Sequence, residues 1–448
     1  MVKGRQTTYN RALEIIENIC IGCSHCMKVC PTEALRVSGG KAGIHADWCI
    51  DCGECYRVCP TRAIRVMDDD FKQIYDFKHR VLLVPSVFFA QFKDSVPRET
   101  IYNIIGELGF TEVCAVEQSV DTLLNEINDY LDTAEKPVIS SFCPAVIRLI
   151  QVRFPSLVDN IMKLLPPIEI TAQYYKKRFE KDGIGESEYG IFYLTPCIAK
   201  IAAVKSPVGG YKSPITGVIN MDFFFNKVYL AYKQRVPITK SIIINGELSS
   251  KGVLFPTTGQ ESAHVKGRTL AIDGMKNIID FLEMLENEEI DNVDFLEIRA
   301  CDESCAGGIL SHRNRFLTAE SLRNFAKKTP VSHNLIEDYK SSCSAVVHMD
   351  KIEPRSMVKY DKDIEIAIKK MEKARRLKKL LPGIDCGACG APSCEALAED
   401  IVRDQAEINS CIFLRTIFEK RGEISLEETI KIMESIWGEE RFDKNDQE

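Results

Sequence analysis

Residues 20–31 read Cys-Ile-Gly-Cys-Ser-His-Cys-Met-Lys-Val-Cys-Pro, and residues 49–60 repeat this spacing as Cys-Ile-Asp-Cys-Gly-Glu-Cys-Tyr-Arg-Val-Cys-Pro. In runs of this kind three cysteines hold one cubane [4Fe–4S] cluster, and the fourth reaches across to the other cluster. The spacing therefore predicts two clusters within residues 1–70. The first ligand set is Cys20, Cys23, Cys26 and Cys59, and the second is Cys49, Cys52, Cys55 and Cys30.

The doubled run, with a proline after each fourth cysteine, matches the spacing of bacterial two-cluster ferredoxins. It predicts a small ferredoxin-like head of α+β fold. Zinc is the alternative, because paired Cys-x2-Cys motifs also bind zinc. The regular doubling of four cysteines favours iron–sulfur clusters.

Apart from its cysteines, the chain has the composition of an ordinary soluble globular protein. Its 448 residues carry a net charge of −7, with 45% hydrophobic and 27% charged residues, which argues against a nucleic-acid partner. No stretch is apolar enough for a membrane span, and the first residues lack the apolar core of a secretion signal. We therefore expect a cytoplasmic protein. In that reducing compartment, 18 clustered cysteines are more typical of metal ligands than of disulfides.

Residues 75–350 are predicted to form an α/β core. Apolar runs at 80–85, 137–142 and 189–194 are typical of buried strands that end at loops. Helical patterns occur at 120–131 and 275–285. Strands that alternate with helices predict mostly parallel sheets flanked by helices.

Three loops of this core carry cysteines. They read Ser-Ser-Phe-Cys-Pro at 140–144, Leu-Thr-Pro-Cys-Ile-Ala-Lys at 194–200, and Ala-Cys-Asp-Glu-Ser-Cys-Ala-Gly-Gly at 300–308. Each follows a strand-like apolar run, and sites in parallel sheets gather where strands end. The four thiols are sufficient to hold a third cubane that only transfers electrons. They belong to Cys143, Cys197, Cys301 and Cys305.

In order and separation, the three loops resemble the signature segments of the [FeFe]-hydrogenase catalytic domain, a family that often carries a two-cluster ferredoxin head. The resemblance covers residues 1 to about 350. It implies that these four cysteines hold a cubane, and that Cys305 bridges to a two-iron subsite with carbon monoxide, cyanide and azadithiolate ligands. Cubane and diiron subsite together form the H-cluster of that family.

Further positions match residues that surround the diiron subsite in this family. Cyanide ligands are negatively charged and need hydrogen-bond donors in an apolar pocket. The resemblance gives this role to Lys200, three residues after Cys197, and to Pro85-Ser86 at the end of the first strand. A surface lysine and a strand-end turn are the structural alternatives.

Four positions depart from hydrogen-evolving members of the family. Phe142 stands where those members have a cysteine that passes protons to the bridgehead amine, and Phe has no exchangeable proton. The other departures are Ala203, Val146 and Arg299. Such losses resemble the sensory or regulatory branch of the family, and they predict low turnover.

The C-terminal region adds a fourth group of cysteines. Residues 357–383 are predicted to be a charged helical connector that stops at Pro382-Gly383, and residues 384–448 a small, mostly helical tail. The tail contains Cys386, Cys389, Cys394 and Cys411. Their spacing resembles the [4Fe–4S] module of some electron-transfer subunits, and zinc is again the alternative.

Together these features predict an anaerobic, hydrogenase-like enzyme that converts hydrogen slowly and reversibly to protons and electrons, as a redox or hydrogen sensor. It would carry two cubanes in the head, one in the H-cluster and one in the tail, plus the diiron subsite. Expected partners are a redox or signalling protein and the maturation proteins that build the diiron subsite. Two alternatives stay open: a relative that keeps only the cubane, and an electron-transfer subunit of a larger oxidoreductase.

Overall fold

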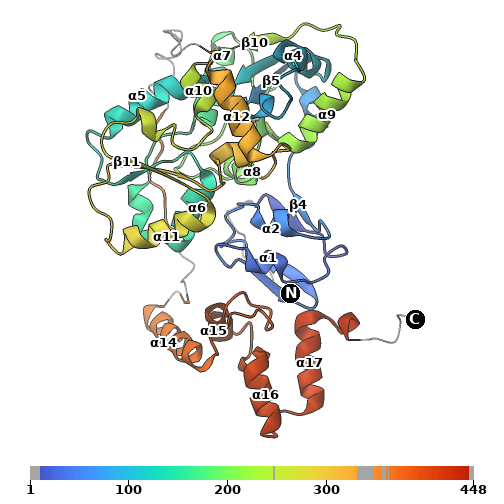
Figure 1. Ribbon diagram of the computed structural model, residues 1–448, viewed down its shortest axis with the longest axis vertical. Coiled ribbons are helices and arrows are strands. Elements are labelled where there is room, and N and C mark those ends of the chain that lie inside the picture. The colour runs from blue at the N-terminus through green and yellow to red at the C-terminus, as the bar shows by residue number, and fades with distance from the viewer. Residues whose placement is uncertain (1–10, 246–247, 330–346, 356–359, 362, 443–448) are drawn as a thin grey trace. The chain divides into compact units, whose positions relative to one another are not determined.

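The computed structural model describes residues 11–245, 248–329, 347–355, 360–361 and 363–442 (Figure 1). The described residues divide into two compact units. The first combines residues of 1–49 and 53–66 with residues from 355 onward, and the second comprises 50–52 and 67–354. The predicted head and tail thus share one unit, and the predicted α/β core makes up most of the other.

The second unit contains a five-stranded sheet in which all strands run parallel. The strand order is β10-β6-β5-β8-β9. The strands are β5 (His79–Val84), β6 (Glu112–Ala115), β8 (Tyr189–Thr195), β9 (Gly217–Asn220) and β10 (Ile243–Asn245). Strand β8 is buried along its whole length, as expected for a parallel strand covered on both faces.

A second parallel sheet has the order β11-β12-β7. Its strands are β7 (Val138–Ile139), β11 (Thr269–Asp273) and β12 (Phe295–Arg299). Strand β7 is shorter than the apolar run at 137–142 predicts. Its ladder ends where the Ser140 amide donates to the Leu296 carbonyl at 2.9 Å, and the chain then turns into a cysteine loop. The prediction of mostly parallel sheets is confirmed.

Helices pack around these sheets (Figure 1). They are α3 (Ser86–Phe89), α4 (Arg98–Glu107), α5 (Val120–Tyr130), α6 (Pro144–Arg153), α7 (Pro167–Lys181), α8 (Ile198–Lys205), α9 (Met221–Lys233), α10 (Ser250–Leu254), α11 (Met275–Glu286) and α12 (Arg315–Ala326). Helices α5 and α11 lie where the helical patterns predicted them. Among the described helices, none combines the length and apolar content that a membrane crossing requires.

The head has the predicted α+β fold. Strands β1 (Leu13–Ile15) and β4 (Ile64–Val66) pair antiparallel, as do β2 (Leu35–Ser38) and β3 (Lys41–Ile44). Two short helices, α1 (His25–Lys28) and α2 (Glu54–Val58), each carry the third cysteine of a run.

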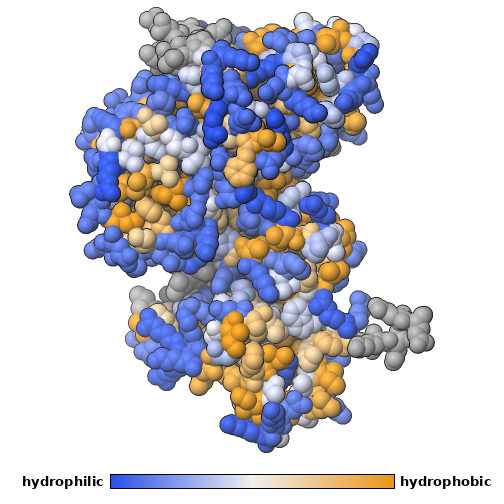
Figure 2. All heavy atoms as spheres, viewed as in Figure 1, coloured by the Kyte–Doolittle hydropathy of each residue, from blue (hydrophilic) through white to orange (hydrophobic). Residues whose placement is uncertain are grey.

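The tail is helical. Its elements are α15 (Cys394–Val402), α16 (Ile412–Lys420) and α17 (Leu426–Trp437), with short 3-10 turns η6 (Ile408–Ser410) and η7 (Glu439–Arg441). The predicted connector before it contains helix α14 (Ile364–Leu380). Helix α14 ends just before Pro382-Gly383, and α17 opens with a capping box between Ser425 and Glu428. Figure 2 shows apolar side chains exposed over α16 and α17. They include Ile412, Phe413, Ile417, Leu426 and Ile430.

The tail packs directly on the head. Three backbone hydrogen bonds join them: Val37 N to Gly390 O (2.9 Å), Gly39 N to Ser435 O (2.8 Å) and Gly40 N to Ile436 O (3.1 Å). Arg36 of β2 also pairs with Asp400 of α15, and both side chains are mostly buried. A Cβ added at Gly390 would lie 2.2 Å from the Val37 carbonyl oxygen, so only glycine permits this approach.

Candidate active site and iron–sulfur centres

Three loops at strand ends carry the predicted ligands of the central cubane. Cys143 lies between β7 and α6, and Cys197 lies between β8 and α8. Cys301 and Cys305 follow β12, with Cys305 in the 3-10 turn η5 (Ser304–Gly307). Burial, followed by the nearby thiols of Cys143 and Cys305, raises the pKa of Cys197 to about 12. Thiols from all three loops therefore lie within electrostatic reach of one another.

This arrangement fits a cubane. A cubane binds its four thiolates at separate iron atoms, so the ligands need not converge on one point. Across the described parts of the chain, no three His, Cys, Asp or Glu side chains are placed to hold a single metal ion. No disulfide joins the cysteines that the structure describes.

Two glycines pack the third loop tightly. A Cβ added at Gly307 would lie 2.0 Å from the Asp302 carbonyl oxygen, and one at Gly308 would lie 2.6 Å from the Pro196 carbonyl oxygen. Contacts this short exclude any side chain at either position. Gly307 thus lets the third loop fold closely on itself, and Gly308 brings it against the loop of Cys197.

Lys200 points toward the predicted bridging cysteine. Its Nζ atom lies 3.8 Å from Cys305 Sγ and 4.5 Å from the centroid of the Phe142 ring. Burial acts to lower the pKa of Lys200, but the neighbouring Cys305, Tyr193 and Cys197 raise it above its ordinary value. The ammonium group therefore stays charged beside Cys305, and this position is inconsistent with a surface lysine.

Ser86 directs both of its donors to a buried carboxylate. Its amide donates to the two Glu117 oxygens at 3.0 Å, and its hydroxyl lies 3.1 Å from Glu117 Oε1 and 3.2 Å from the Val253 carbonyl oxygen. Pro85 precedes it as the cap residue of α3. Burial raises the pKa of Glu117 to about 7, although hydrogen bonds from Ser86 oppose this. The predicted donation by Ser86 to a cyanide therefore requires its hydroxyl to turn away from Glu117.

Two of the departures from the hydrogenase pattern pack against each other. The Arg299 Cζ atom lies 3.7 Å from the centroid of the Phe142 ring, in the geometry of a cation–π contact. The Phe255 ring meets Phe142 edge-on, with centroids 5.2 Å apart. Phe142 is 8% exposed and Arg299 is 1% exposed. The two substitutions thus form a single buried contact.

Two buried carboxylates hold Arg299. Its Nη2 atom donates to Glu261 at 2.7 Å, and its Nε atom lies 3.4 Å from Glu297. Glu297 also accepts from the Gly259 and Ser262 amides. Burial raises the pKa of Glu261 to about 7 against the opposing charge of Arg299. Since Arg299, Glu261 and Glu297 are all buried away from water, removing one of them would leave uncompensated buried charge on the others.

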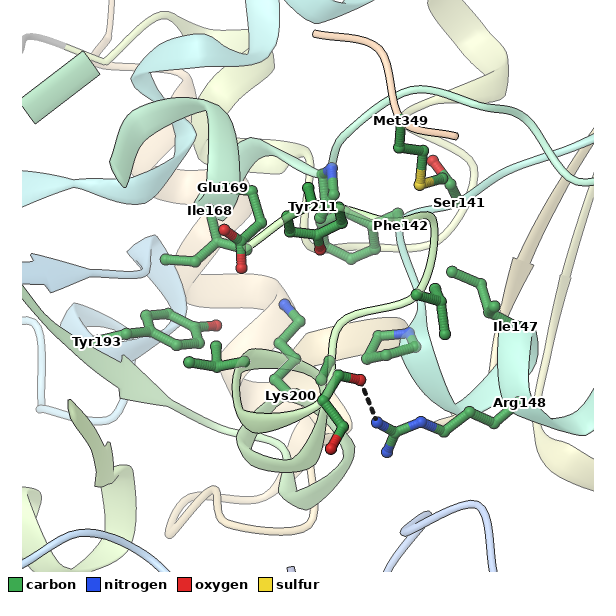
Figure 3. A pocket seen from close by; sticks show the side chains of 16 residues that line it. Ser141, Phe142, Ile147, Arg148, Ile168, Glu169, Tyr193, Lys200, Tyr211 and Met349 are labelled. Atoms are coloured by element: carbon green, nitrogen blue, oxygen red, sulfur yellow. Dashed lines mark hydrogen bonds between the residues drawn. The ribbon is translucent and has the colours of Figure 1, made fainter. Parts of the chain in front are cut away.

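A pocket opens beside Phe142, the ring against which Arg299 packs (Figure 3). It has an empty volume of about 570 Å³, including the part open to solvent. Phe142 and Lys200 line it together with Glu169, Tyr193 and Tyr211. Ala203, one of the departures seen in the sequence, lies on the same wall. The pocket therefore adjoins the residues that the resemblance places around the diiron subsite.

The two cysteine runs of the head are structurally equivalent. The Ala34 amide donates to Cys30 Sγ at 3.2 Å, and the Ala63 amide donates to Cys59 Sγ at the same distance. The Ala42 amide also donates to Cys20 Sγ at 3.4 Å. Amide donors to sulfur stabilise cluster thiolates, so the head fits iron–sulfur clusters.

The tail cysteines gather in and around a small apolar core. Cys411 belongs to this core together with Leu381, Ala391 and Leu397, and Cys389 and Cys394 pack against it. Cys386 is exposed. Burial and the charges of Cys386 and Cys411 raise the pKa of Cys389 to about 11, against a backbone hydrogen bond at Ala391 that lowers it, so these thiols are neighbours.

Two cysteines have no predicted role. Cys114 is buried and accepts a hydrogen bond from Gln118 at 2.8 Å, which is a packing role. Cys343 lies outside the described residues.

Comparison with known proteins gives three family matches along the chain. Residues 79–209 match the C-terminal domain of the iron-only hydrogenase large subunit. Residues 12–60 match a 4Fe–4S dicluster domain, and residues 381–413 match an Fe–S cluster family. An uncharacterized protein of Methanocaldococcus jannaschii is 34% identical over 73 residues, which are 16% of this chain and 33% of that protein. The match thus spans about a third of that relative.

Solved structures of similar proteins include [FeFe]-hydrogenase variants from Chlamydomonas reinhardtii. A Glu-to-Ala variant is 15% identical to this chain, with a TM-score of 0.46. The match covers 65% of this chain and 96% of the hydrogenase chain. A Glu-to-Gln variant is 14% identical to this chain, with a TM-score of 0.47. That match covers 64% of this chain and 97% of the hydrogenase chain. The chain is thus similar to iron–sulfur proteins in three separate segments, with one Fe–S match before the segment that resembles the iron-only hydrogenase domain and another after it.

Proposed function

We propose that this protein binds hydrogen and converts it slowly and reversibly to two protons and two electrons, and that it reports hydrogen or redox state to a partner protein in the cytoplasm. The observation that carries the proposal is the position of Lys200, whose ammonium group lies 3.8 Å from Cys305 Sγ at the edge of the pocket. Anionic cyanide ligands on a diiron subsite would be stabilised by a charged donor at that point.

The four cysteines of the central loops would hold the cubane, and Cys305 would bridge to the diiron subsite. That cofactor supplies the hydrogen chemistry when bound. The chain supplies a fixed cation at Lys200 and an apolar wall at Phe142. Separate buried carboxylates hold Ser86 and Arg299. Phe142 offers no proton acceptor, which is the basis for the low turnover.

Electrons released at the central site would pass to the iron–sulfur clusters of the head and tail. The close packing of tail on head supports direct exchange between those two. Arg441 Nη2 donates to the Ile21 carbonyl oxygen within the first cysteine run at 2.5 Å, and the Met27 side chain faces Gly387 in the tail cysteine loop. We propose the tail cluster as the outlet to a redox or signalling protein, for which the apolar side chains on α16 and α17 offer a contact surface.

Infrared spectroscopy of the full chain, matured anaerobically with its diiron subsite, tests the central proposal. We expect carbon monoxide and cyanide stretches that change under hydrogen. Iron should exceed about 16 per chain, the content of four cubanes with four irons each. A Cys305→Ser variant should lose the stretches and keep the clusters of head and tail. A wild-type protein without the stretches and with only about 16 irons would instead be a cubane-only electron carrier.

Gly390→Ala tests the exchange of electrons between head and tail. We expect the added methyl group to push the tail loop off β2, because it would lie 2.2 Å from the Val37 carbonyl oxygen. The magnetic interaction between reduced tail and head clusters, measured by electron paramagnetic resonance, should then weaken. Gly383→Ala is the matched control, since Gly383 also has a positive φ but its added Cβ meets nothing within 4 Å. Equal spectra for both variants would contradict the prediction.

A further inference from the structure

Glu169 places a carboxyl group in the pocket, and one of its oxygens has no hydrogen-bond partner among the described residues. It lies in the first turn of α7 and is 2% exposed. Its Oε2 atom is buried, and no hydrogen-bond partner for it exists among the described residues. The Ser213 side chain supplies a hydrogen bond to the carboxyl group. An unpartnered buried oxygen costs free energy, so it calls for an explanation beyond packing.

Glu169 faces the same pocket as the residues of the proposed hydrogen site. In Figure 3 its carboxyl group, the Lys200 ammonium and the Tyr193 hydroxyl all point into the pocket. Like the Glu169 oxygen, the Tyr193 hydroxyl is buried with no partner in the described part of the chain. The pocket wall is otherwise largely apolar around Phe142 and Ile168. Glu169 is thus the carboxyl group that lines the pocket beside Phe142.

The electrostatic surroundings allow Glu169 to change its protonation state near neutral pH. Burial raises its pKa to about 7, and the hydrogen bond from Ser213 opposes this only in part. The titratable or charged groups that face it come from four elements: Tyr193 of β8, Lys200 of α8, Arg148 of α6 and Tyr211 of the loop before β9. The charge of Glu169 in turn raises the pKa of Tyr211. No ion pair to Glu169 occurs within the described residues, so no salt bridge fixes its charge.

A carboxylate in the first turn of a helix often only stabilises the helix dipole. That role is served by hydrogen bonds to backbone amides or by exposure to water. Glu169 instead keeps one oxygen free and turns it toward an internal pocket. The helix-start role therefore leaves its orientation unexplained.

We propose that Glu169 is the proton-exchanging residue of this pocket, in place of the thiol that Phe142 lacks. The inference rests on the proposed hydrogen conversion and deepens it. In the oxidising direction, the H–H bond breaks, and each of the two protons forms an O–H bond to the Glu169 carboxylate in turn before it leaves toward solvent. The two electrons go to the iron–sulfur clusters. In the reverse direction, protonated Glu169 returns the protons.

The test compares matured wild-type protein with Glu169→Gln, which keeps the shape of the side chain but cannot exchange a carboxyl proton. We expect hydrogen turnover to fall by about 10²-fold, a typical contribution of a positioned proton-transfer group. Wild-type hydrogen oxidation should rise as pH increases through about 7, because the carboxylate form is the acceptor. Glu169→Gln should lose that midpoint. Ile147→Leu, on the same pocket wall, should stay within twofold of wild type.

A second measurement does not depend on turnover. Infrared difference spectra of the wild type between low and high pH should show the carbonyl stretch of a protonated carboxyl group, and the carbon monoxide bands should shift with the same midpoint. Both signals should vanish in Glu169→Gln. A double variant, Phe142→Cys with Glu169→Gln, should turn over hydrogen at least tenfold faster than Glu169→Gln alone, because the thiol supplies another proton path.

The outcomes separate the two proposals. If Glu169→Gln keeps the wild-type pH profile and turnover while its carbon monoxide and cyanide bands are present, Glu169 does not exchange the protons, and the hydrogen function stands. If neither protein shows those bands after maturation, the proposed function and this inference are both overturned.

Discussion

Replacing Phe142 with Cys is expected to raise hydrogen turnover at least about tenfold. A thiol at this position would lie in the wall of the pocket that Lys200 also lines, where it can give and take a proton. Positioned proton transfer contributes roughly 10²–10⁴ in rate, so even an imperfectly oriented thiol should show a clear gain. The measurement is hydrogen oxidation with an artificial dye acceptor, in variants with equal carbon monoxide and cyanide band intensities.

The structure also shows what else this substitution changes. Phe142 is packed between Arg299 and Phe255, so a smaller side chain leaves a cavity and removes the cation–π contact. Phe142→Ala is therefore the matched control, because it makes a similar cavity without a proton carrier. We expect no gain from the alanine. Equal turnover in the two variants would mean that proton transfer at this position does not limit the rate.

Replacing Arg299 with Ala is expected to lower the free energy of unfolding of the α/β unit by about 3–5 kcal/mol, the usual result of removing one partner from a buried charge group. Glu261 and Glu297 would stay buried without their cation. Glu297 keeps the amide donors of Gly259 and Ser262, whereas Glu261 keeps only the Ser140 hydroxyl. Most of the loss should therefore come from Glu261. Anaerobic urea unfolding, followed by near-ultraviolet circular dichroism, measures it.

The loss in Arg299→Ala should depend on pH. Burial raises the pKa of Glu261 above its unfolded value of 4.5, so the folded state binds more protons than the unfolded state between about 4.5 and 7. Stability should be greatest below that window and should fall as pH rises through it. Without Arg299, the window should extend to higher pH. A double variant, Arg299→Met with Glu261→Gln, removes both charges and should recover more than half of the loss. No recovery would indicate that cavity formation dominates.

The predicted ligand sets rest on information that is local in the sequence. The cysteine runs of the head are fixed by spacing alone, and the three central loops follow strand-like segments whose carboxyl ends meet in parallel sheets. The same rule brings Lys200 near Cys305, since each lies just beyond the end of a strand. The lengths of the helices at 120–130 and 275–286 follow equally from their periodicity.

The residues that surround the predicted cysteine ligands could not be predicted from local spacing. Glu169 has the sequence appearance of an ordinary helix-start carboxylate, and only the fold turns its free oxygen into the pocket. Glu261 lies in a segment with no motif, yet it holds Arg299 from 38 residues away. Phe142 and Arg299 are both visible in the sequence as departures from the hydrogenase pattern. The sequence signal for their contact is that both positions depart from the pattern in the same chain.

The packing of tail on head joins residues that are far apart in the sequence: Arg36 and Asp400 are 364 residues apart, and Ile21 and Arg441 are 420 apart. Periodicity and spacing say nothing about such contacts. Only the glycine at 390, which has a positive φ beneath the Val37 carbonyl, hints that a second backbone must pass close by.

That packing has a consequence for biosynthesis. The unit made of head and tail is discontinuous in sequence, with residues 67–354 inserted between its two parts. During translation the cysteine runs of the head leave the ribosome first, and their covering surface follows only after the inserted residues are made. At roughly 5–20 residues per second, this delay is on the order of tens of seconds. Throughout that interval the tail segments that pack on β2 have not yet been synthesised. We therefore expect the head to be most open to cluster loading, and most vulnerable to oxidation, on the nascent chain, until the later-made tail packs on it.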